Sequence, residues 1–129
     1  MNIHEYQAKE ILAEYGVKMA EGGLAYSVEE AVQRAREIDG DVWVVKAQIH
    51  SGARGKAGGI KVCKSHAEVE KAAEELLGRK LVTHQTGASG KVCSRLYIEA
   101  GTQIAKEIYL SFLIDRVSER VIMIGSAQG

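Results

Sequence analysis

The chain has 129 residues, of which 17 are lysine or arginine and 17 are aspartate or glutamate, so its formal net charge at neutral pH is zero. A chain of this length can bury one hydrophobic core, and without excess charge it has no overall field to draw it onto nucleic acid or a membrane surface. Cys63 and Cys93 form no CxxC pair, which favours a reducing compartment over a disulfide or zinc scaffold. The first residues lack the pattern of a signal peptide, and no apolar stretch is long enough to span a bilayer. We therefore expect a cytoplasmic protein.

Three helix starts follow one another along the chain. Asn2-x-x-Glu5 is a weak start for an N-terminal helix that ends near Gly16. The apolar residues of that helix are Tyr6, Ile11, Leu12 and Tyr15. Ser27-x-x-Glu30 and Ser65-x-x-Glu68 fit the capping box, in which both side chains accept hydrogen bonds from free backbone N–H groups. Apolar residues recur on one helical face behind each serine, so both helices are expected to be amphipathic and packed.

The strand candidates are short runs flanked by glycine, serine or charged residues. Five of them lie at residues 23–26, 42–49, 59–63, 80–84 and 95–100. Further on, apolar and other residues alternate from Ile108 to Asp115, as in a half-buried strand, and a second run, RVIMIG, follows a polar turn. These two runs are predicted to form a hairpin.

A basic, glycine-rich loop, HSGARGKAGG, lies between the second and third strand candidates. It lacks the glycine spacing of a Walker A loop, and alanine instead of serine or threonine follows Lys56. It leads into a strand rather than a helix, which excludes a dinucleotide-binding turn. We interpret it as a hairpin tip whose glycines allow close backbone approach and whose Arg54 and Lys56 could cover a polyphosphate. The alternative is a mobile, solvated basic hairpin that touches RNA through charge alone.

Three charged residues accompany this loop. Lys46 lies near the end of the apolar strand before it, where a lysine either extends to the surface or is held inward by an anion. In the second case Lys46 would grip nucleotide phosphates from below while the loop covers them. Glu99 ends one predicted strand and Glu107 begins another, with Gly101 between them as a candidate hinge. Both glutamates either accept hydrogen bonds from a ribose and an adenine or are ordinary solvated charges.

Four segments of the chain together resemble one enzyme family. They are MNIHEYQAKEIL at the start, WVVKAQIHSGARGKAGGIKV, LVTHQTG, and YIEAGTQIAKEIYL. In this order they are similar to the N-terminal part of the β subunits of the succinyl-CoA synthetases, the ADP-forming succinate–CoA ligases. The likeness covers essentially the whole chain. The β subunits of malate–CoA ligases open with very similar residues and remain the alternative.

The resemblance implies an α+β fold of the ATP-grasp type, in which two subdomains clasp a nucleotide between them. Residues 1–20 would form an N-terminal helix that packs with the second subdomain. Residues 21–101 would form the first subdomain, a mixed sheet with flanking helices and the glycine-rich phosphate loop. Residues 102–129 would be the truncated start of the second subdomain.

The resemblance also implies an ATP site. The implied ATP contacts are Lys46, Ala53, Arg54, Gly55, Glu99, Thr102 and Glu107. Lys46 and the loop around Arg54 would contact the phosphates. Glu99 and Thr102 would lie at the hinge beside adenine and ribose, and Glu107 would also face the nucleotide. Ala53 departs from the family pattern, which more often has glycine there, and would stiffen the loop.

The same likeness places other parts of the enzyme outside this chain. It implies no catalytic nucleophile and no metal ligand here, because the asparagine and aspartate that bind Mg²⁺ would lie beyond residue 129. An α subunit would carry the phosphorylated histidine and the CoA site. The complete enzyme would couple the interconversion of succinate and succinyl-CoA in the citric acid cycle to ATP, or GTP, with no nucleic acid or membrane as partner. The chain alone would be inactive, and a non-catalytic nucleotide-binding module remains open.

Overall fold

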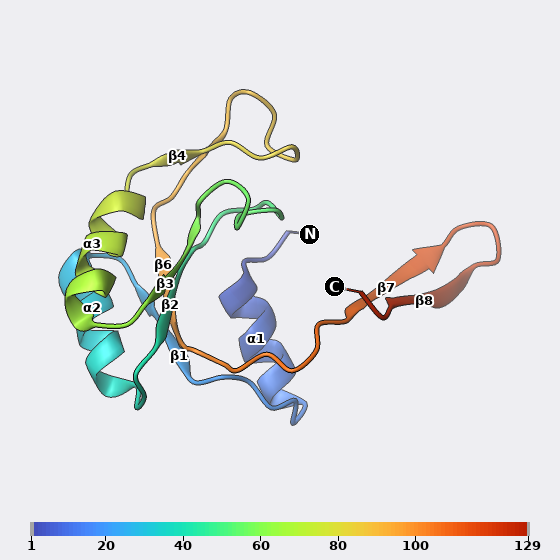
Figure 1. Ribbon diagram of the computed structural model, residues 1–129. Coiled ribbons are helices and arrows are strands. Elements are labelled where there is room, and N and C mark those ends of the chain that lie inside the picture. Colours follow the sequence, from blue (N-terminus) through green and yellow to red (C-terminus); the bar gives the residue numbers. More distant parts are fainter. Residues whose placement is uncertain (1, 129) are drawn as a thin grey trace.

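A four-stranded sheet forms the centre of the computed structural model, which describes residues 2–128. Its strands, in spatial order, are β1 (Gly22–Ala25), β6 (Leu96–Ala100), β2 (Trp43–Ala47) and β3 (Ile60–Cys63). The sheet was expected to be mixed, but all three pairings are antiparallel in the part of the chain that is described. The predicted α+β class is confirmed, since the helices lie against the faces of this sheet (Figure 1).

Helices α2 (Val28–Glu37) and α3 (His66–Leu76) cover one face of the sheet (Figure 1). Both begin at the predicted serine. Ser27 Oγ accepts a hydrogen bond from the Glu30 N–H, and Ser65 Oγ accepts one from the Glu68 N–H, each at 3.2 Å. The two glutamates in turn accept from backbone N–H groups just before the serines. These hydrogen bonds confirm the two predicted caps. The caps could be predicted because each depends only on residues three or four positions apart.

The two faces of the central strands carry different side chains, because successive residues of a strand point to opposite sides. Val45 and Ile98 are fully buried in the hydrophobic core beneath α2 and α3. Their neighbours Lys46 and Glu99 point to the other face. There Lys46 pairs with Glu5 and Glu99 pairs with Lys9, both of the N-terminal helix. The alternation thus separates an apolar core from a charged face within the same two strands.

Helix α1 (Glu5–Glu14) lies on that charged face, across the sheet from α2 and α3 (Figure 1). It begins after His4, whose N–H donates to Gln7 Oε1 at 2.8 Å, so the start expected at Asn2 is wrong. Its apolar residues Ile11 and Leu12 remain about half exposed. Helix α1 is therefore joined to the sheet mainly through polar and charged side chains.

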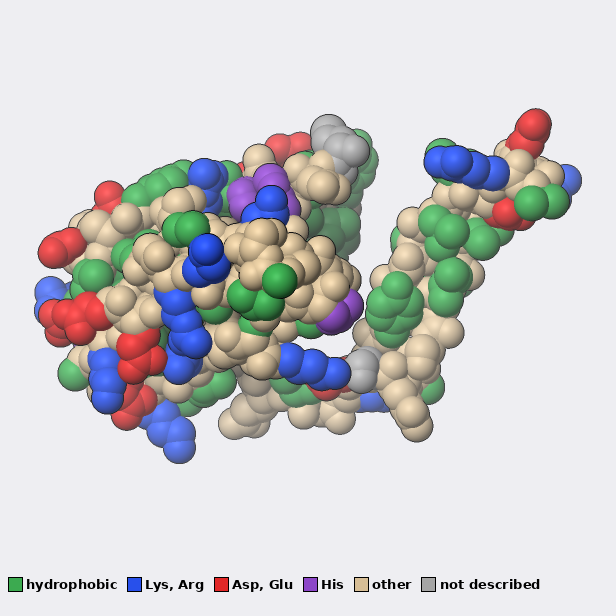
Figure 2. Space-filling view, turned by 90° about the horizontal axis from the view of Figure 1, so that it is seen from above, with side chains coloured by type: hydrophobic (Ala, Val, Ile, Leu, Met, Phe, Trp, Pro, Cys, Tyr) green, Lys and Arg blue, Asp and Glu red, His purple; other side chains and the backbone are tan. Residues whose placement is uncertain are grey.

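The end of the described chain forms a separate hairpin of β7 (Tyr109–Asp115) and β8 (Arg120–Ser126). This confirms the predicted hairpin. It extends away from the rest of the molecule (Figure 1). Apolar side chains are exposed along its length (Figure 2). The strand expected at residues 80–84 is shorter, because only β4 (Lys80–Leu81) pairs, with β5 (Lys91–Val92), before the chain turns at Thr83. Within residues 2–128 no helix is both long and apolar enough to cross a membrane.

Candidate functional site

A cavity of about 690 Å³ opens on the face of the sheet opposite α2 and α3. Its walls come from the loop before β2, from β2, β3 and β6, and from the segment that follows β6. Four of the residues singled out from the sequence line it: Lys46, Glu99, Thr102 and Glu107. Its volume lies within the range of pockets that hold small ligands and cofactors.

Lys46 and Glu99 reach this cavity from neighbouring strands. The register of β2 and β6 pairs Lys46 with Tyr97 and Val44 with Glu99, so the lysine and the glutamate lie two register positions apart and on the same face. Their side chains form an ion pair, and the Glu99 side chain is only 8% exposed. The charge of Lys46 is therefore held inward by carboxylates instead of extending to the surface, which decides between the two alternatives left open by the sequence.

Helix α1 contributes two further charged side chains. Glu5 and Lys9 are one turn apart, so both face the sheet. Glu5 Oε1 accepts a hydrogen bond from Lys46 Nζ at 3.0 Å, and Lys9 forms an ion pair with Glu99. The ammonium of Lys9 also lies 5.2 Å from the centre of the Tyr97 ring, close enough for a cation–π contact. Two acids and two lysines thus alternate across the gap between α1 and the sheet.

Arg54 joins this network from the glycine-rich loop. Its Nη2 donates to Glu5 Oε2 at 2.6 Å, and its Nη1 donates to the Ala47 carbonyl at 2.8 Å. Burial by itself would raise the pKa of Glu5, but the positive charges and hydrogen bonds of Lys46 and Arg54 outweigh it and lower the pKa from 4.5 to about 2. Glu5 is therefore ionised at neutral pH. Lys46 binds its Oε1 and Arg54 its Oε2, and Lys9 Nζ lies 4.0 Å from Oε1.

The loop from residue 48 to residue 59 is closed by backbone hydrogen bonds. The Gly59 N–H donates to the Arg54 carbonyl at 2.8 Å, and the Ala47 N–H donates to the Gly59 carbonyl at 2.8 Å. Ala53 has a φ of 56°, the left-handed region that glycine adopts without a steric cost. Ala53 therefore adopts a backbone conformation that glycine favours.

The tip of the loop is held by residues of the LVTHQTG segment. The Gly52 N–H donates to Gln85 Oε1 at 2.6 Å, and the hydroxyls of Ser51 and Thr83 are within hydrogen-bond distance. A second cavity, of about 420 Å³, lies beside this tip and is lined in part by Glu5, Arg54 and Gln85. The loop is thus a structured, anchored wall, which disfavours the alternative of a mobile, solvated hairpin.

The predicted residues therefore divide into three groups. Lys46 and Glu99, with Thr102 and Glu107, meet in the larger cavity. Arg54 lines the smaller one and is connected to Lys46 through Glu5. In the described structure neither Ala53 nor Gly55 is among the residues that line these two cavities. Their expected part in binding rests on the backbone of the loop and stays a prediction.

Glu5 and Lys9 were not predicted as site residues, although both lie in the first helix and Glu5 was named in its expected start. One signal was available, since two opposite charges one turn apart share a helical face. The apolar residues of that helix indicated another face as the packed one, but the structure leaves Ile11, Leu12 and Tyr15 exposed. A charged helical face is usually solvated, so only the tertiary structure identifies this one as part of a site.

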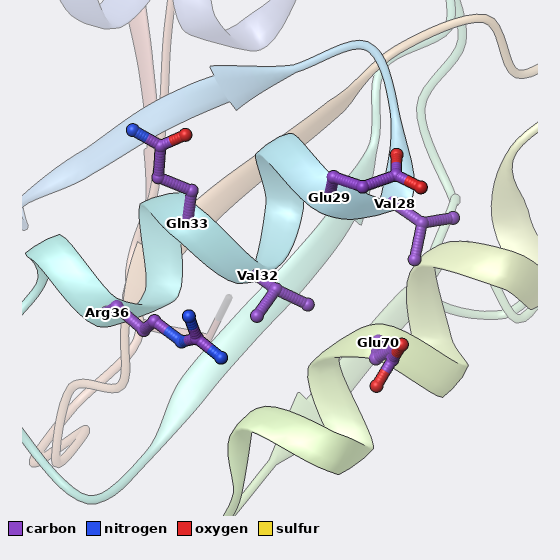
Figure 3. Close-up of a pocket in the computed structure, with 6 residues that line it drawn as sticks. All are labelled: Val28, Glu29, Val32, Gln33, Arg36 and Glu70. Atoms are coloured by element: carbon purple, nitrogen blue, oxygen red, sulfur yellow. The ribbon is translucent and has the colours of Figure 1, made fainter.

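A third hollow, of about 460 Å³, lies away from these residues (Figure 3). It is formed along α2, with Glu70 of α3 across from Val32 and Arg36 (Figure 3). None of the residues proposed for the ATP site line it, and its charged lining residues are one arginine, Arg36, and two glutamates, Glu29 and Glu70. Such a lining offers no excess positive charge for a phosphate.

No metal site accompanies the cavities in the part of the chain that is described. Among residues 2–128, no three or more histidine, cysteine, aspartate or glutamate side chains gather so that they could hold a metal ion.

Gly101 should tolerate no side chain. A methyl group at this position would lie 2.6 Å from Val42 Cγ1 and 2.9 Å from the Val42 carbonyl oxygen. We expect Gly101→Ala to lower the free energy of unfolding by about 1–3 kcal/mol, because neither backbone nor packed side chain can move away freely. Denaturant unfolding of the variant and of Gly125→Ala measures this effect. A methyl at Gly125 would meet no atom closer than 3.8 Å, so that control should lose no stability, and an equal response of both variants would contradict the prediction.

This fold is that of an ATP-grasp domain, and the chain belongs to the ATP-grasp domain family. The family model of the ATP-grasp domain matches residues 2–129.

Curated relatives confirm the resemblance to the N-terminal region of succinate–CoA ligase β subunits that the sequence indicated. The chain is 57% identical over 129 residues to a succinate–CoA ligase [ADP-forming] subunit β of Staphylococcus haemolyticus and 59% identical to that of Parvibaculum lavamentivorans. It is 61% identical to a probable malate–CoA ligase subunit β of Mesorhizobium japonicum. All of this chain is covered in each case, but it spans only 33% of the length of these relatives.

Solved structures agree with this assignment of the fold. A dinucleotide-forming acetyl-coenzyme A synthetase of Ca. Korarchaeum cryptofilum, described in complex with coenzyme A, matches with a TM-score of 0.74 and 24% identity, over 97% of this chain and 53% of that one. Another structure of that enzyme, described with a phosphorylated phosphohistidine segment, matches with a TM-score of 0.66 and 27% identity over the same shares. The ATP-grasp fold is therefore confirmed by sequence and by structure.

Proposed function

We propose that this chain binds ATP or ADP in the larger cavity, with the phosphates directed toward Lys46 and Arg54. The observation that carries this proposal is the convergence of Lys46, Glu99, Thr102 and Glu107 on one cavity whose neighbouring loop brings in Arg54. Lysine and arginine are the usual partners of phosphate oxygens, and arginine can bind two of them at once. Membership of the ATP-grasp family supports a nucleotide as the ligand.

Each residue has a role in this proposal. Lys46 and Arg54 bind phosphate oxygens, and the backbone at Ala53 and Gly55 approaches the phosphates closely where the loop turns. Glu99 and Thr102 lie beside the ribose and adenine, where a carboxylate and a hydroxyl accept or donate hydrogen bonds. Glu107 faces the nucleotide from the segment after β6. Names of curated relatives that specify ADP formation support adenine over guanine as the base.

The complete protein is proposed to be a succinate–CoA ligase, with this chain as the nucleotide-binding part of its β subunit. The enzyme would couple the interconversion of succinate and succinyl-CoA to ATP synthesis or hydrolysis in the citric acid cycle, in the cytoplasm. The identity of 57–59% to named ADP-forming succinate–CoA ligases supports this activity. The α subunit would supply the phosphohistidine and the CoA site, and Mg²⁺ would be bound by residues beyond position 129. The related structures named with coenzyme A and a phosphohistidine segment are consistent with these partners.

The contribution of this chain to phosphoryl transfer is electrostatic and positional. Negative charge is distributed over the transferred phosphoryl group as its bonds are exchanged, and fixed positive groups near it lower the barrier. Lys46 and Arg54 supply such charges, and the anchored loop limits the access of water. No residue of the cavity is proposed as a nucleophile.

Malate is the second candidate for the acid substrate, because the probable malate–CoA ligase is 61% identical to this chain. None of the residues proposed above contacts the acid, so the choice rests on likeness alone. Steady-state kinetics of the complete enzyme with succinate and with malate would decide it. A higher kcat/KM for malate would replace succinate in this proposal.

Titration of the chain with ATP in the presence of MgCl₂, followed by calorimetry, tests the nucleotide site. We expect saturable binding of one ATP per chain, with weaker binding of AMP and much weaker binding of adenosine, because the phosphates provide the contacts to Lys46 and Arg54. Absence of ATP binding by a folded chain would reject the site. Binding of RNA with a steep dependence on salt concentration would favour the basic-hairpin alternative.

A further inference from the structure

Glu5 lies at the boundary between the two cavities of the candidate site. It lines the smaller cavity together with Arg54, while Lys46, its other partner, lines the larger one. Its two carboxylate oxygens are divided between these cations, with Oε1 bound to Lys46 Nζ at 3.0 Å and Oε2 to Arg54 Nη2 at 2.6 Å. A single side chain of α1 therefore bridges the two positive groups that come from the strand and from the loop.

This arrangement has the chemistry of a bound phosphate. A phosphate group held between a lysine and an arginine presents anionic oxygens to each of them, at distances close to those of the Glu5 contacts. The cations are directed to Glu5 by the protein itself, since Arg54 is also fixed by its hydrogen bond to the Ala47 carbonyl. The Glu5 carboxylate therefore occupies the place between Lys46 and Arg54 where an anionic ligand would be bound most strongly.

The charges around Glu5 do not leave room for a second anion beside it. Three cations, Lys9, Lys46 and Arg54, face two carboxylates, Glu5 and Glu99. A triphosphate placed next to an ionised Glu5 would meet a like charge at short distance, in a region where each of the five side chains is about one-fifth exposed or less. One of the two anions must move for the other to be bound by the same cations.

We propose that Glu5 is an internal occupant of the phosphate subsite, which the phosphates of a nucleotide displace when they bind. The inference rests on the proposed nucleotide-binding function and adds a gating role for α1. In the free chain Glu5 keeps Lys46 and Arg54 paired and oriented. On binding, the phosphates take over both cations, and Glu5 turns away with its end of the helix.

Replacement of Glu5 by glutamine tests this role. The amide retains the shape of the side chain but no longer competes for the cations as an anion. We expect Glu5→Gln to lower the Kd for ATP by about fivefold, which corresponds to the release of one ion pair of about 1 kcal/mol. The Kd for adenosine, which has no phosphate, should not change. Calorimetric titration of wild type and variant with ATP and with adenosine measures both.

Glu14→Gln is the matched control, because Glu14 lies in the same helix and is exposed. An equal gain in ATP affinity in both variants would show a general effect of charge and overturn the inference. An unchanged or weaker affinity of Glu5→Gln would overturn it as well, because Glu5 would then only position the cations. If the folded wild-type chain and both variants bind no ATP, the proposed function fails and this inference fails with it.

A measurement on the wild type removes the dependence on a variant that folds poorly. The carbon-13 resonance of the Glu5 side-chain carboxyl reports on its partners. We expect it to shift when ATP is added and to stay in place when adenosine is added at the same occupancy. A carboxyl resonance that does not respond to saturating ATP would show that Glu5 keeps its two cations, and would overturn the proposal.

Discussion

Replacement of Lys46 by methionine is expected to raise the Kd for ATP by about ten- to a hundredfold, since a hydrogen bond to a charged group contributes about 1.5–3 kcal/mol and 1.4 kcal/mol is a tenfold change. In the complete enzyme phosphoryl transfer should slow by orders of magnitude, because the lost charge acts most strongly as negative charge builds up in the transition state. The chain should still fold. Glu5 keeps Arg54 as a partner and Glu99 keeps Lys9, so neither carboxylate is left unpaired. Calorimetric titration with ATP and single-turnover kinetics measure the two effects.

Lys61→Met provides the control for this prediction. Lys61 belongs to the next strand of the same sheet, but its side chain pairs with Glu75 of α3 at 3.0 Å, on the side away from the cavity. Its removal changes the net charge by the same amount and should leave the Kd for ATP unchanged. A Lys46→Met chain with near-normal affinity, and an enzyme with a near-normal rate, would refute the assignment of the phosphate site.

Replacement of Ile98 by alanine is expected to lower the free energy of unfolding by about 2–5 kcal/mol, the range found when a large buried aliphatic side chain is truncated. Ile98 is fully buried in the middle of β6, between β1 and β2 and beneath the helices. The loss combines the lost transfer free energy of the side chain with the cavity that it leaves. Because Glu99 is the next residue, a weakened β6 should also reduce ATP affinity. Urea unfolding and calorimetry measure the two consequences.

Ile114→Ala serves as the comparison for the core. Ile114 also lies in a strand, but it belongs to the β7–β8 hairpin and is 71% exposed. Its truncation removes little buried apolar surface and should cost less than about 1 kcal/mol. If the two variants lose similar amounts of stability, the core is not centred on β6 as the structure indicates.

Elements whose stability depends on near neighbours could be predicted from the sequence. The starts of α2 and α3 were read correctly because each serine cap bonds a backbone group three residues away. The hairpin of β7 and β8 was predicted correctly because its pairing and its turn are local, but β7 is exposed along most of its length and is not half-buried as its alternating residues indicated. The N-terminal helix shows the limit of this approach, since its start lies at His4 and not at Asn2.

Elements whose stability depends on distant partners could not be predicted in the same way. The position of β6 between β1 and β2 joins segments that are far apart in the chain, and no local pattern specifies that order. The strand expected at residues 80–84 ends after two residues, because Thr83 accepts and donates hydrogen bonds within a turn. An apolar stretch alone does not show where such a turn interrupts it.

Some residues of the candidate site could also be predicted from the sequence, and others could not. Lys46, Arg54 and Glu99 were singled out from residue type, the glycine-rich loop and the family resemblance. The sequence also indicated that Ala53 departs from a glycine position, and its φ of 56° now supplies the physical reason for glycine there. Glu5 and Lys9 could not be assigned to the site from the sequence, because their partners lie between 41 and 90 residues away in the chain.

The amino-acid sequence by itself determined the helix caps, the β7–β8 hairpin and the residue types of the glycine-rich loop. These depend on residue types and short spacings, which a linear sequence contains completely. The tertiary structure decided which charges meet. A chain with zero net charge holds three cations and two carboxylates together on one face of its sheet, because the strength of an ion pair depends on distance and burial, and only the packing of α1 against β2 and β6 sets these.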